Sequence, residues 1–396
     1  MDFRPSQEHV MFREAVARFA QEELSKYVKP MEETDKFPLE VFRSLGQMGF
    51  LGAHFPEEFG GAGADFTSFC IFIEEVGRVS AAISVNVLLH TLMGAAPIFL
   101  VGSDAQKQEH FVPAIRGEKI VAAGLTEPNV GSSAADIETT AKRVDGGWRI
   151  NGAKMFTSNG PYCDLITLVA STDRAKRHKG ISLFLVDSRT PGVTLGPNIS
   201  RLGIMGGETG SLTFEDVRVP ESALLGEEGK GFYYLMEALN MTRVALAAGC
   251  VGLAQAAFDA ALEYAKSRQQ FGQPIGKFQG ISFKLADMST EIELARLFVY
   301  KVAWMVEQKE KVAKEAAMAK LYASEMATRV AHRALQIHGG YGFSKEFPLE
   351  RYYRDARIFE IFQGTSEVNR VIIAGQLGGL AVYARNMALL RRRPED

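Results

Sequence analysis

The feature that most constrains the fold is one long helical pattern in the second half of the chain. Residues 232–266 contain no proline, are rich in alanine and leucine, and carry apolar side chains on most faces of the implied helix. A helix that is apolar all round is buried on several sides, so it needs other helices around it. Three further helical patterns follow at residues 278–307, 311–337 and 366–376, with short breaks between them. This arrangement predicts a helical bundle.

The residues before this bundle have a different pattern of predicted secondary structure. The first 118 residues carry helical patterning, in which Phe12, Val16 and Phe19 share one helix face and Ser6 is a candidate N-cap. The next part holds short β-rich runs separated by glycine and asparagine turns, which favours a small barrel or sandwich. These runs lie at residues 119–125, 148–150, 165–170, 181–186 and 211–219.

The predicted class is therefore α+β, with three structural units in the order helices, strands, helices. The expected units are an N-terminal α-helical unit (1–118), a central β unit (119–228), a C-terminal helical bundle (229–384) and a tail (385–396). A cleft is expected where the three units meet, because ligand sites favour such junctions.

Composition narrows the range of partners. With 45 Lys and Arg against 47 Asp and Glu, the net charge of −2 gives no electrostatic reason to expect nucleic acid or a membrane surface. The three consecutive arginines at 391–393 are interpreted as part of a solvated tail. The sequence contains no uncharged apolar run of about 18 residues, so no membrane span is predicted. The first residues lack a signal-peptide pattern. The cytoplasm of a bacterium, or a mitochondrial matrix after loss of a leader, fits best.

The cysteines and histidines show no metal-type spacing. Cys70, Cys163 and Cys250 are odd in number and far apart, so reduced and mostly buried thiols are expected. His332 and His338 lie six residues apart, which is wrong for two ligands on one helix face. No metal site is expected.

Three polar segments carry glycine and could receive a ligand. Residues 125–133 and 154–160 lie in the β unit and offer backbone N–H groups and hydroxyls, although ordinary turn chemistry explains them equally well. In the third segment, 355–367, Gly364 and Thr365 stand just before a helix. An exposed helix start can hold an anionic or carbonyl oxygen, or Thr365 can act only as a cap.

Together these segments resemble the acyl-CoA dehydrogenase family, over nearly the whole chain from about Phe3 to Gly378. The matching strings are LTEP at 125–128 with Gly131 and Ser132, KMFTSNG at 154–160, FEDVRVP at 214–220, RQQFG at 268–272, QIHGGYG at 336–342, YRDAR at 353–357 and GTSE at 364–367. Each string alone is modestly specific, but all of them in the family's order are very specific.

The resemblance implies an N-terminal α-helical domain, a central β-barrel and a C-terminal four-helix bundle, in agreement with the three units above. It also implies one FAD per subunit, an acyl-CoA substrate, an electron-transferring flavoprotein as electron acceptor, and a homo-oligomer that is usually a tetramer. Positions that match the family's flavin contacts on the β unit are Leu125, Thr126, Gly131, Ser132, Phe156 and Ser158. Positions that match contacts to the neighbouring subunit's flavin are Arg268, Phe271, Gln336 and Gly340, while Thr365 and Glu367 match positions near the adenosine part. Ser132, Arg243 and Gly364 are the expected substrate-binding residues.

The family reaction is an α,β-desaturation in which a carboxylate removes the α-proton of the thioester. Most members carry that Glu directly before Gly364, but here the position is Gln363. Some members carry it on the first bundle helix, where this chain has Thr242. An amide cannot accept the proton, and a positioned base contributes about 10²–10⁴ in rate.

Three interpretations of Gln363 stay open at this point. The first is an introduced Glu-to-Gln substitution in a dehydrogenase. The second is an enzyme that uses another base, or that catalyses elimination or reduction of an acyl thioester. The third is a protein that binds FAD and acyl-CoA without turnover. Glu360 is the nearest carboxylate in the sequence but need not face the flavin, and neither the acyl chain nor the choice between coenzyme A and an acyl-carrier protein follows from the residues.

Overall fold

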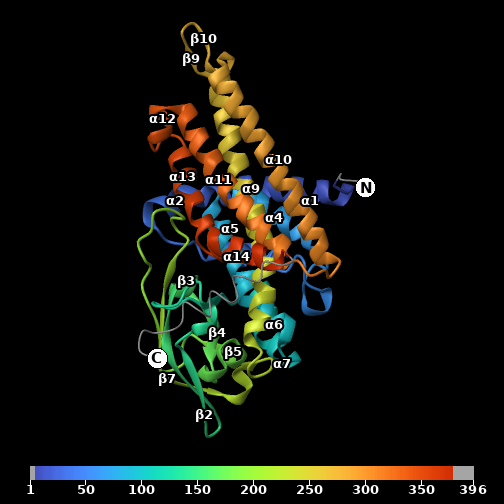
Figure 1. Cartoon of the computed structure of the whole chain (residues 1–396), viewed down its shortest axis with the longest axis vertical. Coiled ribbons are helices and arrows are strands. Elements are labelled where there is room, and N and C mark those ends of the chain that lie inside the picture. Colours follow the sequence, from blue (N-terminus) through green and yellow to red (C-terminus); the bar gives the residue numbers. More distant parts are fainter. Residues whose placement is uncertain (1–4, 378–396) are drawn as a thin grey trace.

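The computed structural model of the chain describes residues 5–377 and has the predicted order of helices, strands and helices (Figure 1). The α+β class, with a helical unit, a β unit and a helical bundle, is confirmed. The expected tail at 385–396, including residues 391–393, lies outside the described residues, as does the end of the bundle predicted to reach 384.

The N-terminal unit is built from eight α-helices, some of which continue into one another through π-helical turns. The helices are α1 (Gln7–Phe19), α2 (Ser25–Thr34), α3 (Glu40–Gln47), α4 (Phe66–Val79), α5 (Ala81–Leu88), α6 (Ala96–Val101), α7 (Asp104–Gln106) and α8 (Val112–Ile115). Ser6 caps α1 as predicted, because its side chain accepts a hydrogen bond from the backbone N–H of His9. Val16 is fully buried, and Phe12 and Phe19 pack against the same core.

The β unit is a mixed eight-stranded sheet. Its strands are β1 (Val121–Gly124), β2 (Thr140–Val144), β3 (Gly147–Ser158), β4 (Leu165–Ser171), β5 (Ile181–Asp187), β6 (Val193–Leu195), β7 (Thr209–Pro220) and β8 (Leu224–Leu225). The order in the sheet is β6-β7-β3-β2-β4-β5-β8, and β1 pairs with β4 in parallel. Trp148 and Phe184 meet edge to face in a small core of this unit.

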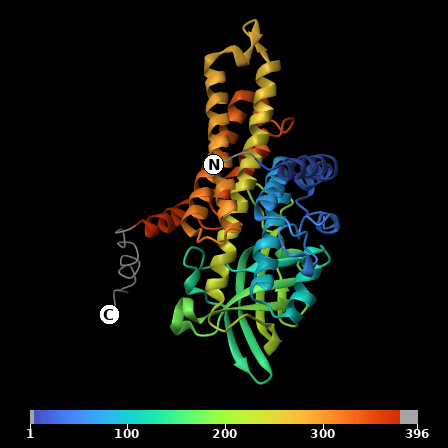
Figure 2. The same cartoon turned by 90° about the vertical axis from the view of Figure 1, so that its right-hand side faces the viewer.

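The helical bundle contains the remaining α-helices. They are α9 (Gly231–Ser267), α10 (Gln279–Glu307), α11 (Ala313–His338), α12 (Gly340–Phe343), α13 (Leu349–Ala356) and α14 (Ser366–Gln376), with the short hairpin of β9 (Gln269–Gln270) and β10 (Gln273–Pro274) at the tip. Figure 2 shows α9 running from the β unit up to that tip, with α10 beside it. The long helix predicted at 232–266 is confirmed as α9.

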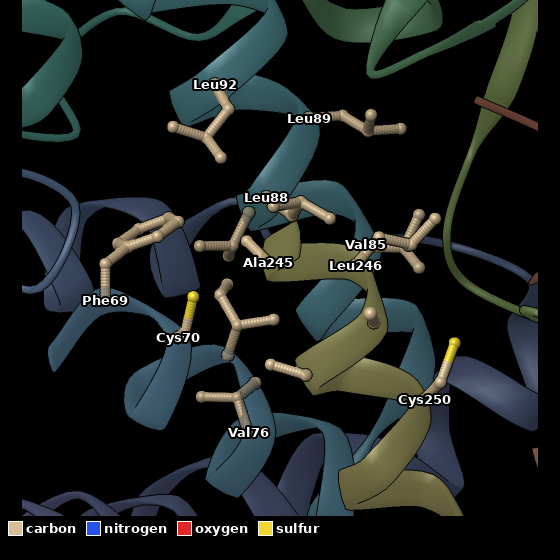
Figure 3. Close-up of a cluster of buried hydrophobic side chains, with 14 of the residues drawn as sticks. Phe69, Cys70, Val76, Val85, Leu88, Leu89, Leu92, Ala245, Leu246 and Cys250 are labelled. Carbon is tan, nitrogen blue, oxygen red and sulfur yellow. The ribbon is translucent and has the colours of Figure 1, made fainter. Parts of the chain in front are cut away.

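The N-terminal unit and the bundle share one apolar core along α9. Phe69, Cys70 and Val76 of α4 face Ala245 and Leu246 of α9, and the side chains of α5 close the cluster (Figure 3). The two helices approach closely because glycines line the contact: a Cβ on Gly252 would lie 2.0 Å from the carbonyl oxygen of Glu74. Helix α9 is therefore packed closely against α4 along this contact.

Two helical segments are long and apolar enough to cross a membrane, although the sequence predicted none. They are residues 81–101 and α9, and 89% and 72% of their most apolar windows are buried inside the protein. Burial by neighbouring helices accounts for their apolar character. Cys70, Cys163 and Cys250 are free and buried, as predicted.

Candidate active site

Backbone hydrogen bonds shape the loop that follows β1. Residues 125–133 leave the sheet and fold back on themselves through paired backbone hydrogen bonds between Glu127 and Val130. Gly131 and Ser132 are exposed at its far end, and a Cβ on Gly131 would meet no protein atom within 4 Å. The loop therefore presents backbone to the outside of the sheet, and its first residues Leu125 and Thr126 are half-buried.

A buried ion pair fixes this loop to β3. Lys154 Nζ lies 2.7 Å from Glu127 Oε1 and donates to the carbonyl of Leu125 at 3.1 Å, and both charged side chains are almost completely buried. Glu127 also accepts the backbone N–H groups of Glu138 and Thr139. Burial raises the pKa of Glu127, but the Lys154 ammonium and the N–H donors of Thr139 and Glu138 together outweigh it and hold that pKa below its usual range. Burial lowers the pKa of Lys154 to about 8.

Phe156 projects from β3 beside this loop. The pairing of β3 with β7 shifts register between Lys154 and Thr157, and Phe156 adopts a left-handed backbone (φ 54°) there. A left-handed non-glycine residue costs energy, and such residues cluster at functional sites. The Phe156 side chain is 62% exposed. Ser158, two residues on, lies beside Thr209 with 3.4 Å between the hydroxyl oxygens. This edge thus offers an aromatic face and hydroxyls to a planar ligand.

The second part of the site is the turn between residues 360 and 366. Gln363 and Gly364 both have a left-handed backbone, with φ 55° and φ 90°. Gly364 is required by its φ and by close packing, since a Cβ there would lie 3.3 Å from the Val368 side chain. The amide oxygen of Gln363 is buried and has no hydrogen-bond partner within residues 5–377.

The carbonyl groups of this turn face the bundle. Arg243 Nε, on α9, donates to the Gln363 carbonyl at 3.2 Å. Lys320 Nζ, on α11, donates to the Gly364 carbonyl at 2.7 Å, and Asn369 Nδ2 donates to the same oxygen at 2.8 Å. Because C=O and N–H of one trans peptide point in opposite directions, the N–H groups of Gly364 and Thr365 point away from these donors. Within the described residues, no protein acceptor is recorded for the N–H of Gln363 or Gly364.

Two cations are buried at this turn without a carboxylate. Arg243 is 5% exposed and Lys320 is fully buried, and in the described part of the chain neither makes an ion pair. Burial lowers the pKa of Arg243 to about 10 and that of Lys320 to about 8. Among the predicted residues, the structure thus brings Arg243, Gln363 and Gly364 together.

The remaining predicted residues of the turn have local roles. Thr365 caps α14, because its hydroxyl accepts the backbone N–H of Val368 at 3.2 Å. Glu367 is exposed in the first turn of that helix. Glu360 accepts the Thr328 hydroxyl at 2.5 Å and pairs with Arg357 at 3.2 Å, so its carboxylate is occupied. Thr242 donates its hydroxyl to the Ala238 carbonyl within α9.

The tip of the bundle holds a separate pocket. Arg268, Phe271 and Gly340 line it with Tyr341, whose ring lies 5.7 Å from the Arg268 guanidinium. Phe271 is 93% exposed, and Gln336 is exposed on the last turn of α11 beside the pocket. At a rise of about 1.5 Å per residue, the 25 helical steps from Arg243 to Arg268 put this pocket about 37 Å from the Gln363 turn. The four tip residues therefore lie too far away to serve the same ligand ring in one chain.

Lys320 and Asn369 were not predicted as site residues from the sequence. A signal for Lys320 exists: Ala316, Ala323 and Ala327 are its neighbours on the same face of α11, and all are buried. A lysine on an otherwise apolar helix face is therefore a candidate for a buried charge. Asn369 gives no such signal, because its two acceptors belong to the turn just before its own helix. No three His, Cys, Asp or Glu side chains of residues 5–377 gather as metal ligands would.

The arrangement can polarise a carbonyl group. Free N–H groups at a left-handed turn form a concave donor site for a negatively charged oxygen, and two cations behind the turn strengthen it. The structure shows no carboxylate of the turn free to act as a base, since Glu360 is engaged.

Comparison with family models shows matches along the chain. The acyl-CoA dehydrogenase N-terminal domain matches residues 6–118, the middle domain residues 122–217 and the C-terminal domain residues 229–378. The probable acyl-CoA dehydrogenase YngJ of Bacillus subtilis is 43% identical over 378 residues, covering 95% of this chain and 100% of that protein. The 3-(aryl)acrylate reductase of Clostridium sporogenes is 41% identical over 372 residues, covering 94% and 99%.

Solved structures show the same likeness. Butyryl-CoA dehydrogenase from Megasphaera elsdenii superposes with a TM-score of 0.92 at 38% identity, covering 99% of this chain and 100% of that chain. A chain in a structure described as the electron transferring flavoprotein of Acidaminococcus fermentans superposes with a TM-score of 0.94 at 37% identity, covering 96% and 100%.

Proposed function

The chain belongs to the acyl-CoA dehydrogenase family, and from that premise we propose that it desaturates an acyl-CoA thioester between its α and β carbons and passes the electrons to an electron-transferring flavoprotein. It is a flavin-dependent oxidoreductase of the acyl-CoA dehydrogenase type, with FAD as its cofactor. When bound, FAD supplies the hydride acceptor. What this chain's own residues contribute is binding, orientation and the polarisation of the acyl carbonyl.

The observation that carries the proposal is the left-handed turn at Gln363 and Gly364. Its carbonyls are held by Arg243, Lys320 and Asn369, and its N–H groups are left free. A thioester oxygen that accepts the Gln363 N–H would share its negative charge with this donor as the α-carbon loses its proton. This proposed contact is what would make the α-proton acidic enough to leave.

The β unit fits a flavin. Phe156 offers an exposed ring held on a strained backbone, and the loop beside it offers unhindered backbone at Gly131. In the proposal, Leu125, Thr126, Gly131, Ser132, Phe156 and Ser158 would hold the flavin, Thr365 and Glu367 would lie near its adenosine part, and Ser132, Arg243 and Gly364 would bind the acyl-CoA.

The tip residues imply a second subunit. Arg268, Phe271, Gln336 and Gly340 would reach the flavin of a neighbouring copy, which accounts for a pocket about 37 Å from the turn. A further sign is the apolar outer face of α10, where Phe283 and Trp304 are exposed. Exposed apolar patches of this kind mark protein interfaces. We therefore include a homotetramer in the proposal.

Gln363 limits the rate of this proposed reaction. The neutral amide keeps the shape of the pocket but cannot take the α-proton, so in the parent this proton would pass to solvent water, a weaker base than a carboxylate. A second candidate function, reduction of an α,β-unsaturated acyl thioester, is favoured by the likeness to the 3-(aryl)acrylate reductase. That direction needs no α-proton abstraction, although a proton must still be delivered to the α-carbon.

Anaerobic mixing with a panel of acyl-CoAs tests the proposal. The purified protein should be yellow, and binding should shift the flavin spectrum in both the parent and Gln363→Glu. Flavin bleaching should be about 10²–10⁴ faster in Gln363→Glu, whereas Glu360→Gln, the matched control, should behave as the parent. Reoxidation of the reduced parent by an enoyl-CoA would support the reductive direction. Release of a leaving group without bleaching would indicate elimination, and a colourless protein that FAD cannot reconstitute would overturn both functions.

A further inference from the structure

Lys320 is the most deeply buried charge near the proposed reaction centre. Its side chain has no exposed surface, and its ammonium group lies 2.7 Å from the carbonyl oxygen of Gly364. Asn369 holds the same oxygen at 2.8 Å. Two donors from two different helices therefore converge on one peptide group, that which joins Gly364 to Thr365.

The charge of Lys320 is not neutralised by a carboxylate. No ion pair involves Lys320 in residues 5–377, and the nearby Glu360 already binds Thr328 and Arg357. Burying an ammonium group is costly unless it is paired. A buried cation that serves stability alone would be expected beside a carboxylate, as Lys154 lies beside Glu127. The placement of Lys320 against a single carbonyl therefore needs another explanation.

The held carbonyl constrains the turn on its other side. A trans peptide is planar, so fixing the Gly364 oxygen fixes the direction of the Thr365 N–H. Arg243 fixes the Gln363 carbonyl in the same way and with it the Gly364 N–H. With both planes held, the left-handed backbone of Gly364 between them is fixed, and the carbonyl end of the left-handed Gln363 is fixed with it.

We propose that Lys320 is a positioning residue: by holding the Gly364 carbonyl it fixes the backbone of Gly364, and so keeps the left-handed turn in the shape in which the free N–H of Gln363 faces the carbonyl oxygen of the acyl thioester. This inference rests on the proposed function, since it assumes that an acyl thioester binds at the turn. Lys320 does not touch the substrate in this role. It acts through the peptide groups of residues 363–365.

The charge state of Lys320 gives the role a pH dependence. Burial lowers the pKa of Lys320 to about 8, so the ammonium form is lost in mildly alkaline solution. The charged or titratable groups around it are Arg243 and Cys250 on α9, Glu325 on α11 and Glu360 on the turn before Gln363. Arg243 stays protonated because its pKa is about 10, and burial raises the pKa of Cys250 well above its usual range. Carbonyl recognition should therefore weaken as the pH rises through about 8.

The test compares butyryl-CoA with its thioether analogue S-butyl-CoA, which lacks only the carbonyl oxygen. Dissociation constants for the FAD-loaded protein are measured by flavin absorbance and calorimetry. In the parent the ratio of the two constants reports the recognition of the carbonyl. In Lys320→Met we expect this ratio to fall about tenfold, with affinity for S-butyl-CoA and FAD content unchanged. Lys320→Arg should restore most of the ratio. Lys314 is a partly exposed lysine of the same helix that pairs with Glu315, so Lys314→Met should leave the ratio at the parental value.

Two results would overturn the inference. One is an unchanged ratio in Lys320→Met. The other is an equal loss of affinity for both ligands, which indicates a structural role only. The parent gives an independent reading that needs no variant: its ratio should fall between pH 7 and 9, and a flat profile would contradict the role. If the parent binds butyryl-CoA and S-butyl-CoA equally well, the proposed acyl-thioester site itself is wrong. This outcome contradicts the proposed function and not only the role of Lys320.

Discussion

Two lysines are completely buried within residues 5–377, and they have different partners. Lys154 in β3 lies 2.7 Å from the Glu127 carboxylate, whereas Lys320 in α11 lies 2.7 Å from a neutral peptide oxygen. The first belongs to a closed ion pair that ties a loop to the sheet. The second leaves its charge uncompensated beside a turn that carries free N–H groups. Two equally buried lysines can therefore have different roles, and the partner atom distinguishes them. A lysine paired with a carboxylate stabilises the local structure, whereas a lysine that binds a single peptide carbonyl orients that peptide.

The largest effect is expected when the closed pair is broken. Lys154→Met should destabilise the protein by about 3–5 kcal/mol, because it leaves the Glu127 carboxylate buried without a cation. The measurement is urea unfolding of the FAD-free protein at pH 7. The double variant Glu127→Gln/Lys154→Met should recover most of the loss, because it removes both charges. A single variant that loses less than about 1 kcal/mol would show that the pair is not needed to keep the loop folded.

Much of the fold followed from local chemistry. The Ser6 cap and the proline-free helix α9 were predicted because caps and helical periodicity involve residues close in sequence. Strand β2 (Thr140–Val144) was missed. Its sequence TAKRV has little apolar character, and it becomes a strand by pairing with β3 and by a single bridge to β4. Such pairing depends on distant residues and leaves only a weak trace in a short polar stretch.

The candidate site divides in the same way. Gln363, Gly364 and Arg243 could be named from motifs, because a resemblance carries residue identities. The partner of each buried lysine could not be named, since Glu127 and Lys154 are 27 residues apart and Lys320 and Gly364 are 44 apart. Nothing in the helical pattern of α11 says which chain segment its one buried lysine will meet. The left-handed backbone of Gln363 could not be predicted from the sequence either, because glutamine has no preference for that conformation.

A second prediction concerns the pH dependence of stability. The pKa of Lys320 falls from 10.5 to about 8 on folding, so between these pH values the unfolded chain binds a proton that the folded chain does not. Stability must then rise with pH across this interval, by roughly 3 kcal/mol for the whole shift. Lys154 contributes a rise of its own, so the parent is compared with Lys320→Met. The parent should gain stability relative to the variant between pH 8 and 10.5, and parallel profiles would mean that Lys320 titrates normally.

The smallest effect is expected for Lys320→Met at pH 7, and it completes the contrast with Lys154→Met. The variant loses one hydrogen bond, worth about 1.5–3 kcal/mol for a charged donor. It also removes the cost of burying an unpaired charge, and Asn369 still satisfies the Gly364 oxygen. These terms oppose each other, so the net change should be within about 1 kcal/mol of zero by urea unfolding. A loss as large as that of Lys154→Met would place Lys320 among the structural anchors and remove the distinction between the two lysines. A near-zero change, together with a lost preference for the acyl carbonyl, would show that the burial of Lys320 serves recognition.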